Sequence, residues 1–379
     1  MLNQVLTAEI GDESHRSATE PDYSAISKKP ASADFFAGSG LATEGLKDFF
    51  DSVWANDICA KKQAVFAANH SPEIFTLDSI ENIKGDKLPR HSLSWASFPC
   101  QDLSLAGNMG GITSSRSGMV WQWLRILDEM REAPAVLVAE NVRGLVSGKN
   151  GENYLALHNA LLERQYNVGA VLIDAVHWVP QSRPRIFVIA VRKSTDISGF
   201  ITDSPTWAHP KAIQAIASKA TDWTWWNIPA PSTPMHPLEK IIELDAPFDS
   251  EETVNHHLSL IPKSHFDKLE AAVKKGQKVF PGYKRIRNGQ QVLEVRTDGL
   301  AGCLRTPTGG SSRQQLVIYR NGKFGTRLLT VKEAAQLMGA HKYQIPGTYN
   351  QGYKAMGDAV VVPVVRHLAE HLLYPLIKK

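Results

Sequence analysis

The chain has 379 residues, 43% of them hydrophobic, which excludes a disordered chain and favours two or three domains with proper cores. Its 42 Lys and Arg against 38 Asp and Glu give a formal net charge of +4, which permits nucleic-acid binding without requiring it. Three cysteines lack metal-ligand spacing and no apolar run is long enough to cross a bilayer, so we expect a reduced cytoplasmic protein without disulfides, a cysteine zinc site or a membrane segment.

Residues 1–30 are polar and carry no sustained periodicity, which is typical of a flexible leader. Structure is expected from about Ser32, where a strand leads into residues 36–40 (FAGSG) and then into a helical pattern that ends near Phe50. A strand, a glycine-rich turn and a helix in this order can bind a nucleotide-like ligand through backbone N–H groups. The alternative is a plain tight turn.

Two acids follow the next predicted strands. Residues 53–57 end at Asp57, at the distance beyond the glycines where dinucleotide-binding folds place a carboxylate on ribose hydroxyls. A short strand at about 75–77 is followed by Asp78, which could accept a hydrogen bond from an adenine amino group. Each acid alone could be a solvated strand-end residue, but together with the glycine turn they predict a cofactor site.

Cys100 stands directly after a proline, at the end of a probable buried strand over residues 93–98. Open parallel sheets present their working residues at this end of the strands. A partly ionised thiol there is a strong nucleophile, and residues 101–107 resemble a loop that could close over a substrate. The alternative is that Cys100 is a small buried hydrophobe, and this stretch alone does not decide between the two.

A second carboxylate lies at the end of an apolar strand. Residues 134–139 follow a predicted helix at 118–130 and lead into Glu140, which must find a partner or hold a raised pKa suited to acid catalysis. The alternative is a strand-end acid capped by local backbone. Arg183 and Arg185 precede a strand at 186–191, and alternate positions point to one face, where they can pair with a carboxylate and a polar ligand.

The alternation of strands and helices up to residue 191 predicts an α/β fold with a doubly wound, mostly parallel sheet. Beyond it, proline-rich connections predict a second, irregular and mostly β domain, with the tryptophans at 223, 225 and 226 in core or hinge packing. Helical periodicity returns near Thr330, and the chain is expected to close with an apolar strand and a long helix within residues 360–376.

Taken in order, these motifs resemble those of the C5-cytosine DNA methyltransferase family, of the bacterial restriction-modification or prophage kind. The resemblance runs from about residue 32 to the C-terminus and includes Glu333-Ala334-Ala335 and the last motif, Gly357-Asp358-Ala359-Val360. It implies a Rossmann-like catalytic domain (31–194 plus 345–379) that binds S-adenosyl-L-methionine and yields S-adenosyl-L-homocysteine. It also implies a target-recognition domain (195–344), a monomer, duplex DNA as partner, and room for a cognate restriction endonuclease.

The resemblance also implies roles for single residues. The Cys100 thiolate would add to C6 of a flipped-out cytosine, Glu140 would stabilise or protonate N3, Arg185 would hold O2 with Arg183 orienting Glu140, and no metal is needed. The implied cofactor contacts are Phe36, Ala37, Gly38, Ser39, Gly40, Asp57, Ile58, Asp78, Ser79, Pro99, Asp358 and Ala359. The expected DNA contacts are Gln101, Ser104, Arg285, Arg287, Arg305 and Arg313.

The chain departs from the family pattern at Leu41, Ile58, Cys303 and Asp358, where a glycine, an aromatic residue, a threonine and an asparagine are usual. Asp358 places a negative charge close to the expected cofactor, and Cys303 has no role assigned to it. Two alternatives stay open. One is an RNA cytosine methyltransferase of the same fold, and the other is a non-catalytic DNA-binding descendant, against which the retention of all four expected catalytic residues speaks.

Overall fold

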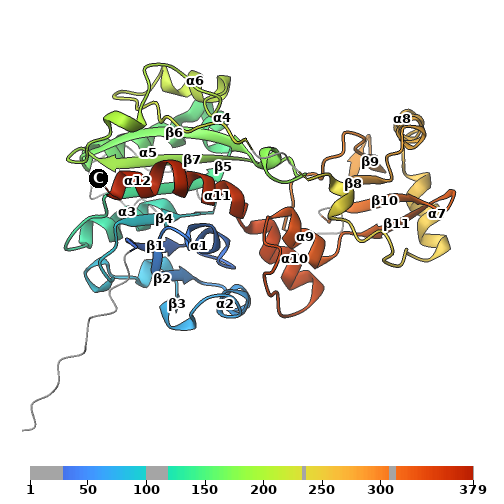
Figure 1. Cartoon of the computed structure of the whole chain (residues 1–379), viewed down its shortest axis with the longest axis horizontal. Coiled ribbons are helices and arrows are strands. Elements are labelled where there is room, and N and C mark those ends of the chain that lie inside the picture. Colours follow the sequence, from blue (N-terminus) through green and yellow to red (C-terminus); the bar gives the residue numbers. More distant parts are fainter. Residues whose placement is uncertain (1–28, 100–117, 233–235, 307–312, 379) are drawn as a thin grey trace, which may run out of the picture.

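The computed structural model describes residues 29–99, 118–232, 236–306 and 313–378, which form a larger and a smaller lobe, each built on one sheet (Figure 1). The larger sheet has the order β3-β2-β1-β4-β5-β7-β6, with strands β1 (Ala31–Phe35), β2 (Asp51–Asp57), β3 (Phe75–Leu77), β4 (Leu93–Ala96), β5 (Val136–Val142), β6 (Tyr166–Asp174) and β7 (Pro184–Arg192). The smaller sheet has the order β11-β10-β8-β9, with strands β8 (Val279–Arg287), β9 (Gln290–Val295), β10 (Gln315–Arg320) and β11 (Lys323–Leu328).

Twelve α-helices occur in the described part of the chain. The larger lobe carries α1 (Leu41–Leu46), α2 (Ala60–Ala67), α3 (Met119–Glu129), α4 (Gly144–Ser147), α5 (Glu152–Glu163), α6 (Lys211–Ala217), α11 (Val362–Leu368) and α12 (Tyr374–Lys378). The smaller lobe carries α7 (Glu251–Ser259) and α8 (Lys263–Lys274), and α9 (Val331–Leu337) and α10 (Tyr349–Asp358) lie between the lobes (Figure 1).

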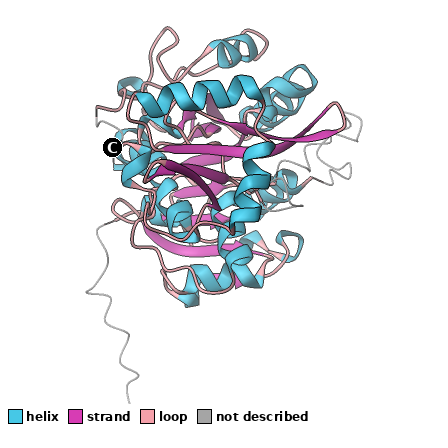
Figure 2. Ribbon diagram, turned by 90° about the vertical axis from the view of Figure 1, so that its right-hand side faces the viewer, coloured by secondary structure: helices cyan, strands magenta, loops and turns pink. Residues whose placement is uncertain are grey.

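The larger sheet confirms the predicted Rossmann-like fold. Strands β1 to β5 pair in parallel, and only β7 runs antiparallel to its neighbours β5 and β6. Helices cover both faces of this sheet (Figure 2), which explains why its central strands are almost continuously apolar. The carboxyl ends of β1, β2, β4 and β5 therefore meet at one edge, where the predicted site residues follow them.

The C-terminal helices complete the larger lobe. Helix α11 packs on α1, so segments from opposite ends of the chain lie side by side (Figure 1). A Cβ added to Gly45 would lie 2.5 Å from the Cβ of Val365, so the close approach of the two helices requires this glycine. The stretch Tyr349–Lys378 is apolar and long enough to cross a membrane, but 61% of its most apolar window is buried, which is typical of a core helix.

The prediction of an apolar strand before the terminal helix is wrong. Residues 359–361 are irregular, and α11 begins at Val362 with a proline, Pro363, in its first turn. Proline lacks an N–H and fits the start of a helix. A fully buried helix and a fully buried strand have the same apolar composition, so this run alone could not distinguish them.

Residues 200–228 pack on the larger sheet. The indole N–H of Trp226 donates to the carbonyl of Ile189 on β7 at 3.2 Å, and Thr224 N–H donates to the carbonyl of Val168 on β6 at 2.9 Å. A Cβ on Gly169 would lie 1.9 Å from Thr224 O, so this glycine admits the covering segment. The tryptophans pack as expected.

The domain division remains a prediction, and these contacts lead us to propose that the second domain begins after residue 229.

The smaller lobe has its own core, and a buried ion pair lies at the start of α9, the helix that follows its last strand. Leu269, Phe280 and Val317 are central to that core. Arg327 Nη2 lies 2.5 Å from Glu333 Oε1, and the Glu333 side chain is fully buried. Glu333 also closes a capping box at the start of α9, which sets the direction in which the chain returns to the larger lobe.

Candidate active site

The glycine-rich turn follows β1 in a strained conformation. Phe36, Gly38 and Gly40 have φ angles of 56°, 57° and 84°, in the left-handed region that a phenylalanine rarely adopts. Asp57, at the end of β2, accepts hydrogen bonds from the N–H groups of Gly38 at 3.0 Å and Cys59 at 2.8 Å. The turn and the acid that we expected to bind one cofactor therefore lie in contact.

Two apolar side chains are exposed beside this acid. Ile58 is 72% and Leu77 is 42% exposed, and the strand register places Leu77 opposite Asp57. Asp78 follows Leu77, and its Oδ1 accepts hydrogen bonds from the N–H of Ser79 at 2.7 Å. Exposed apolar surface next to carboxylates fits a ligand that combines a flat ring with hydroxyl groups.

Asp34 on β1 is a buried acid that our sequence reasoning missed. It is 1% exposed, its Oδ2 accepts the Thr43 hydroxyl at 2.9 Å, and its Oδ1 has no partner among the described residues. Burial raises the pKa of Asp34 to about 7, although the hydrogen bonds from Thr43 oppose the shift. An aspartate inside an apolar strand (ASADF) is the signal that could have drawn attention to it.

Glu140 and Arg185 form an ion pair at the far end of the same edge. Arg185 Nε lies 3.1 Å from Glu140 Oε1, and the two side chains are 14% and 10% exposed. Burial raises the pKa of Glu140, although Arg185 and Arg183 act against the shift. A carboxyl group in this setting can hold a proton for transfer better than an exposed one.

Arg183 does not take the role that we expected. We assigned the orientation of Glu140 to Arg183, but the ion pair to Glu140 comes from Arg185. Arg183 is 1% exposed and donates to the carbonyls of Leu304 at 2.8 Å, Gly357 at 2.8 Å and Ala359 at 2.6 Å. Gly357 lies in the last turn of α10, and Leu304 and Ala359 lie outside helices and strands, so one buried guanidinium with several donors binds three backbone carbonyls together.

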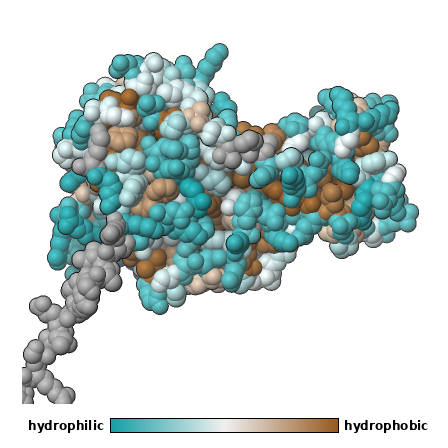
Figure 3. Space-filling model, in the orientation of Figure 1, coloured by the Kyte–Doolittle hydropathy of each residue, from teal (hydrophilic) through white to brown (hydrophobic). Residues whose placement is uncertain are grey.

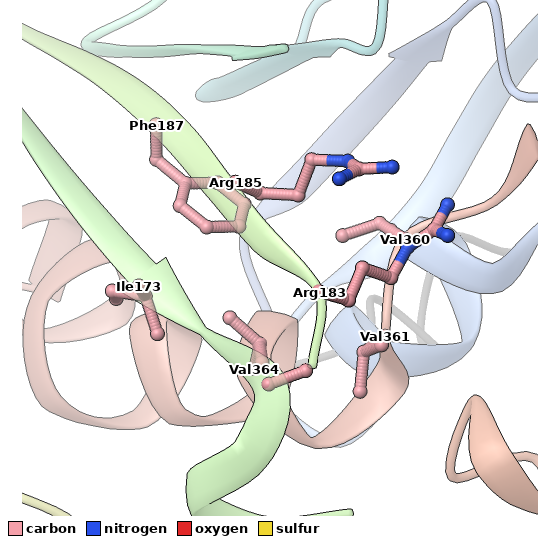
Figure 4. Close-up of a pocket in the computed structure, with 8 residues that line it drawn as sticks. Ile173, Arg183, Arg185, Phe187, Val360, Val361 and Val364 are labelled. Atoms are coloured by element: carbon pink, nitrogen blue, oxygen red, sulfur yellow. The ribbon is translucent and has the colours of Figure 1, made fainter. Parts of the chain in front are cut away.

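A pocket lies beneath these two arginines, between β7 and α11. Its lining includes Phe187, Val360 and Val364, and both guanidinium groups extend to the same side of it (Figure 4). Burial and the neighbouring Arg185 lower the pKa of Arg183 to about 10, so the Arg183 guanidinium stays charged at neutral pH. The edge of the sheet is therefore positive at the place where a polar ligand would meet Glu140.

Cys303, to which we had assigned no role, lies against both arginines. Its Sγ is 3.3 Å from Arg183 Nη1 and 3.9 Å from Arg185 Nη2, and its carbonyl accepts the Tyr283 hydroxyl at 2.7 Å. Burial opposes ionisation of the thiol, but the two arginines outweigh it and lower the pKa of Cys303. No sequence pattern predicts this contact, because it joins segments 120 positions apart.

Cys100, Gln101 and Ser104 lie outside the described residues. The chain reaches them along β4, which pairs with β5 so that Ala96 lies opposite Ala139. Asn141 Nδ2 donates to the carbonyl of Phe98 at 2.9 Å, which fixes the segment that precedes Cys100 beside the strand that ends in Glu140. Pro99 is exposed at this point.

Four arginines expected to contact DNA lie within the described residues, two on β8 and two in the segment between β9 and β10. Arg287 on β8 pairs with Glu294 at 2.7 Å, and Arg285 stacks over the ring of Tyr283. Arg305 is exposed and directly follows the segment that Arg183 binds. Arg313 donates to Asn350 Oδ1 at 2.6 Å on α10.

Asp358 does not carry an uncompensated charge. Its Oδ2 lies 2.9 Å from Nζ of Lys62 on α2, a residue that our sequence reasoning did not single out. Its Oδ1 accepts the Thr306 hydroxyl at 2.5 Å. The only sign of this ion pair in the sequence was a lysine that follows shortly after Asp57.

The chain matches the family model described as C-5 cytosine-specific DNA methylase over residues 31–373. It is 24% identical to the type II methyltransferase M.Bsp6I of Bacillus sp. (strain RFL6), over 90% of this chain and 97% of that protein. It is 27% identical to the type II methyltransferase M.HhaI of Haemophilus parahaemolyticus, over 89% and 93% of the two chains.

Solved structures share the fold at lower identity. The S. pombe Dnmt2 methyltransferase aligns with a TM-score of 0.60 and 16% identity, covering 92% of this chain and 99% of that one. A putative DNA modification methyltransferase encoded within an E. coli prophage aligns with a TM-score of 0.56 and 18% identity, covering 93% and 100%.

Proposed function

The chain belongs to the C-5 cytosine-specific DNA methylase family and is a DNA (cytosine-5-)-methyltransferase, and from this premise we propose how its residues work. We propose that it transfers a methyl group from S-adenosyl-L-methionine to C5 of a flipped-out cytosine in a specific duplex sequence. The observation that carries the proposal is the buried Glu140–Arg185 ion pair, beside the strand that leads to Cys100.

The residues at the β1–β3 end fit the proposed cofactor. S-adenosyl-L-methionine supplies an electrophilic methyl group on a sulfonium. Asp57 would accept hydrogen bonds from the ribose, because each of its oxygens has a lone pair beyond the backbone N–H that it already binds. The exposed side chains of Ile58 and Leu77 would pack on the adenine ring. Asp78 would accept from the exocyclic amine.

The residues at the β4–β5–β7 end fit the cytosine. The Cys100 thiolate would form a bond to C6, which makes C5 nucleophilic enough to take the methyl group. Glu140 would donate its proton to N3 as charge develops on the ring, which its raised pKa favours. Arg185 would hold O2. A solvent water would then take the C5 proton, the thiolate would be eliminated from C6, and the N3 proton would return to Glu140, which restores the aromatic ring and the starting enzyme.

Arg183 has a positioning role in this proposal. Its hydrogen bonds to Leu304, Gly357 and Ala359 hold the segment between β9 and β10, and the end of α10, against β7. The guanidinium therefore fixes the place of Arg185 and Cys303 without touching the substrate. The space-filling view shows the molecule narrowing between its two lobes (Figure 3), and the smaller lobe would hold the opened duplex there.

The curated relatives are named type II methyltransferases, which supports a place in a restriction-modification system. A monomer in the cytoplasm, acting on the same site as a cognate endonuclease, is the form that we propose. The recognised sequence would be set by arginines of the smaller lobe and its edge, such as Arg285 and Arg305.

The test is bisulfite sequencing of mixed-sequence duplex DNA after incubation with S-adenosyl-L-methionine. We expect wild-type protein to protect cytosine in one sequence context and Cys100→Ser to protect none. An RNA pool is treated in parallel. Protection in RNA alone would replace the DNA substrate with RNA, and protection in neither would contradict the proposal, provided that the protein is folded by circular dichroism.

A further inference from the structure

The sulfur of Cys303 lies between the two arginines of β7. Arg183 Nη1 donates to it at 3.3 Å, and Nη1 and Nη2 of Arg185 lie 4.0 and 3.9 Å from it. On its other side, Arg185 pairs with Glu140 at 3.1 Å. Cys303 therefore connects Arg183, which binds backbone carbonyls, to Arg185, which we propose to hold O2 of cytosine.

The Arg185 guanidinium is held on three sides. Its Nε faces Glu140, its Nη1 donates to the carbonyl of Pro184 at 2.9 Å, and both Nη atoms face the sulfur at nearly equal distances. A guanidinium group is planar, so contacts along two of its edges fix both its position and its plane. The contact with sulfur thus keeps the group from turning about its Cδ–Nε bond.

Cys303 is itself fixed by both lobes. Its carbonyl accepts the hydroxyl of Tyr283 on β8 at 2.7 Å, and the N–H of Leu304 donates to Gln181 in the larger lobe at 3.0 Å. A Cβ added to Gly302 would lie 2.6 Å from the ring of Tyr283, so this segment packs closely on β8. The sulfur therefore has a defined place relative to β7.

The two guanidinium groups carry like charges and extend to the same side of their pocket (Figure 4). Burial and repulsion from Arg185 both lower the pKa of Arg183. A polarizable sulfur that accepts from both groups offsets part of this repulsion. Cys303 thus favours the arrangement that keeps Arg185 beside Glu140.

We propose that Cys303 is a positioning residue for methyl transfer, which holds the Arg185 guanidinium in line with Glu140 and with O2 of the cytosine. The inference rests on the proposed function. A donor that is fixed before the substrate arrives stabilises the charge that develops on O2 without having to reorganise. Cys303 acts through Arg185 and takes no part in bond formation.

The test is single-turnover methylation by the full chain, with saturating S-adenosyl-L-methionine and a duplex that carries the context found by bisulfite sequencing. We expect Cys303→Ala to lower the rate constant about 5- to 10-fold, the range for one lost hydrogen bond. The affinity for S-adenosyl-L-homocysteine should change less than about 2-fold.

Two further variants separate positioning from packing. Cys303→Ser keeps a hydrogen-bond acceptor, and its rate should stay within about 3-fold of wild type. Cys303→Val fills the space of the sulfur without an acceptor, and it should be as slow as Cys303→Ala. The opposite order, with a fast valine and a slow serine variant, would show that only the volume of the sulfur matters and would overturn the inference.

A double-mutant cycle tests whether Cys303 acts through Arg185. In an Arg185→Lys background the sulfur has no guanidinium fork to hold, so Cys303→Ala should change the rate less than about 2-fold. An equal loss in both backgrounds, or a Cys303→Ala rate equal to that of wild type, would contradict the inference. A folded wild-type protein that methylated no cytosine would instead overturn the proposed function.

Discussion

The two ends of the working edge of the larger sheet are built in different ways. At the β1–β2 end, Gly38 and Asp57 are 19 positions apart and join through one hydrogen bond, and the apolar side chains beside them are exposed. At the β5–β7 end, Arg183 binds segments that are 121, 174 and 176 positions away, and its side chain is fully buried. The first end is built on neighbouring strands, with α10 added from far along the chain, and is open, leaving apolar side chains exposed. The second end is built by distant segments around a buried guanidinium and is closed.

This difference predicts different consequences of mutation. Except at the buried Asp34, a change at the open end should alter ligand binding and leave the free energy of unfolding almost untouched. Removal of a side chain that holds the closed end together should alter stability and chemistry together, because Arg183 lies beside the groups that would act on cytosine.

The largest effect is expected from Arg183→Ala. The variant leaves three backbone carbonyls without their donor and opens a cavity in the closed end. We expect the free energy of unfolding to fall by about 3–5 kcal/mol, as for other broken buried charge networks, with loss of methylation. Urea denaturation measures this. Asp57→Asn is the companion at the open end, and equal destabilisation of the two variants would remove the distinction between the ends.

Glu140→Gln separates chemistry from folding at the closed end. The amide keeps the shape of the side chain and can still contact Arg185, but it has no proton to give to N3. We expect the methylation rate to fall about 10²- to 10⁴-fold, the usual contribution of a general acid. The melting temperature should change little. Single-turnover methylation of a labelled duplex measures the rate, and a variant within about 3-fold of wild type would show that Glu140 is not the proton donor.

Asp34 gives the open end a dependence on pH. Its pKa of about 7 lies above the ordinary 3.8, so the folded state binds more protons than the unfolded state between these values. The free energy of unfolding therefore falls as pH rises from about 4 to 7, because the folded protein must ionise a buried carboxyl group. Above pH 7 this loss of stability no longer changes. Asp34→Asn removes this titration. We expect its stability relative to wild type to be more favourable at pH 8 than at pH 5 by roughly 2–3 kcal/mol.

Chemical denaturation at the two pH values measures this difference. The same stability difference at pH 5 and pH 8 would mean that Asp34 does not titrate in this range, and an opposite sign would mean that the folded protein prefers the charged carboxylate.

The smallest effect is expected outside both ends, at Arg287. Its pair with Glu294 is exposed, so Arg287→Gln should change the free energy of unfolding by less than about 0.5 kcal/mol. If Arg287 contacts a phosphate, the slope of log affinity for duplex DNA against log salt should fall by about 1. Fluorescence anisotropy at several salt concentrations measures the slope. An unchanged slope would remove Arg287 from the DNA-contacting surface.

The same difference explains what could be predicted from the sequence. The glycine turn, Asp57 and the strand at 75–77 follow from local patterns, and the structure places them as expected. The Arg183 contacts, the place of Cys303 and the Lys62–Asp358 pair depend on segments more than 100 positions apart, so no local pattern encodes them. The prediction of a strand in the apolar C-terminal segment was wrong, because a segment that is buried on all sides lacks the periodicity that distinguishes a strand from a helix.

The covalent bond between Cys100 and C6 of cytosine is the step on which the proposed mechanism rests. It is tested most directly by incubating the protein and S-adenosyl-L-methionine with a duplex that carries 5-fluorocytosine at the target position. A base can remove a proton from C5 but not a fluorine, so the thiolate cannot be eliminated. The adduct therefore persists through denaturation, and intact-mass measurement detects it. We expect a methylated protein–DNA adduct for the wild type and none for Cys100→Ser. An adduct that still formed with Cys100→Ser, or a wild type that methylated ordinary DNA without ever being trapped, would contradict this mechanism.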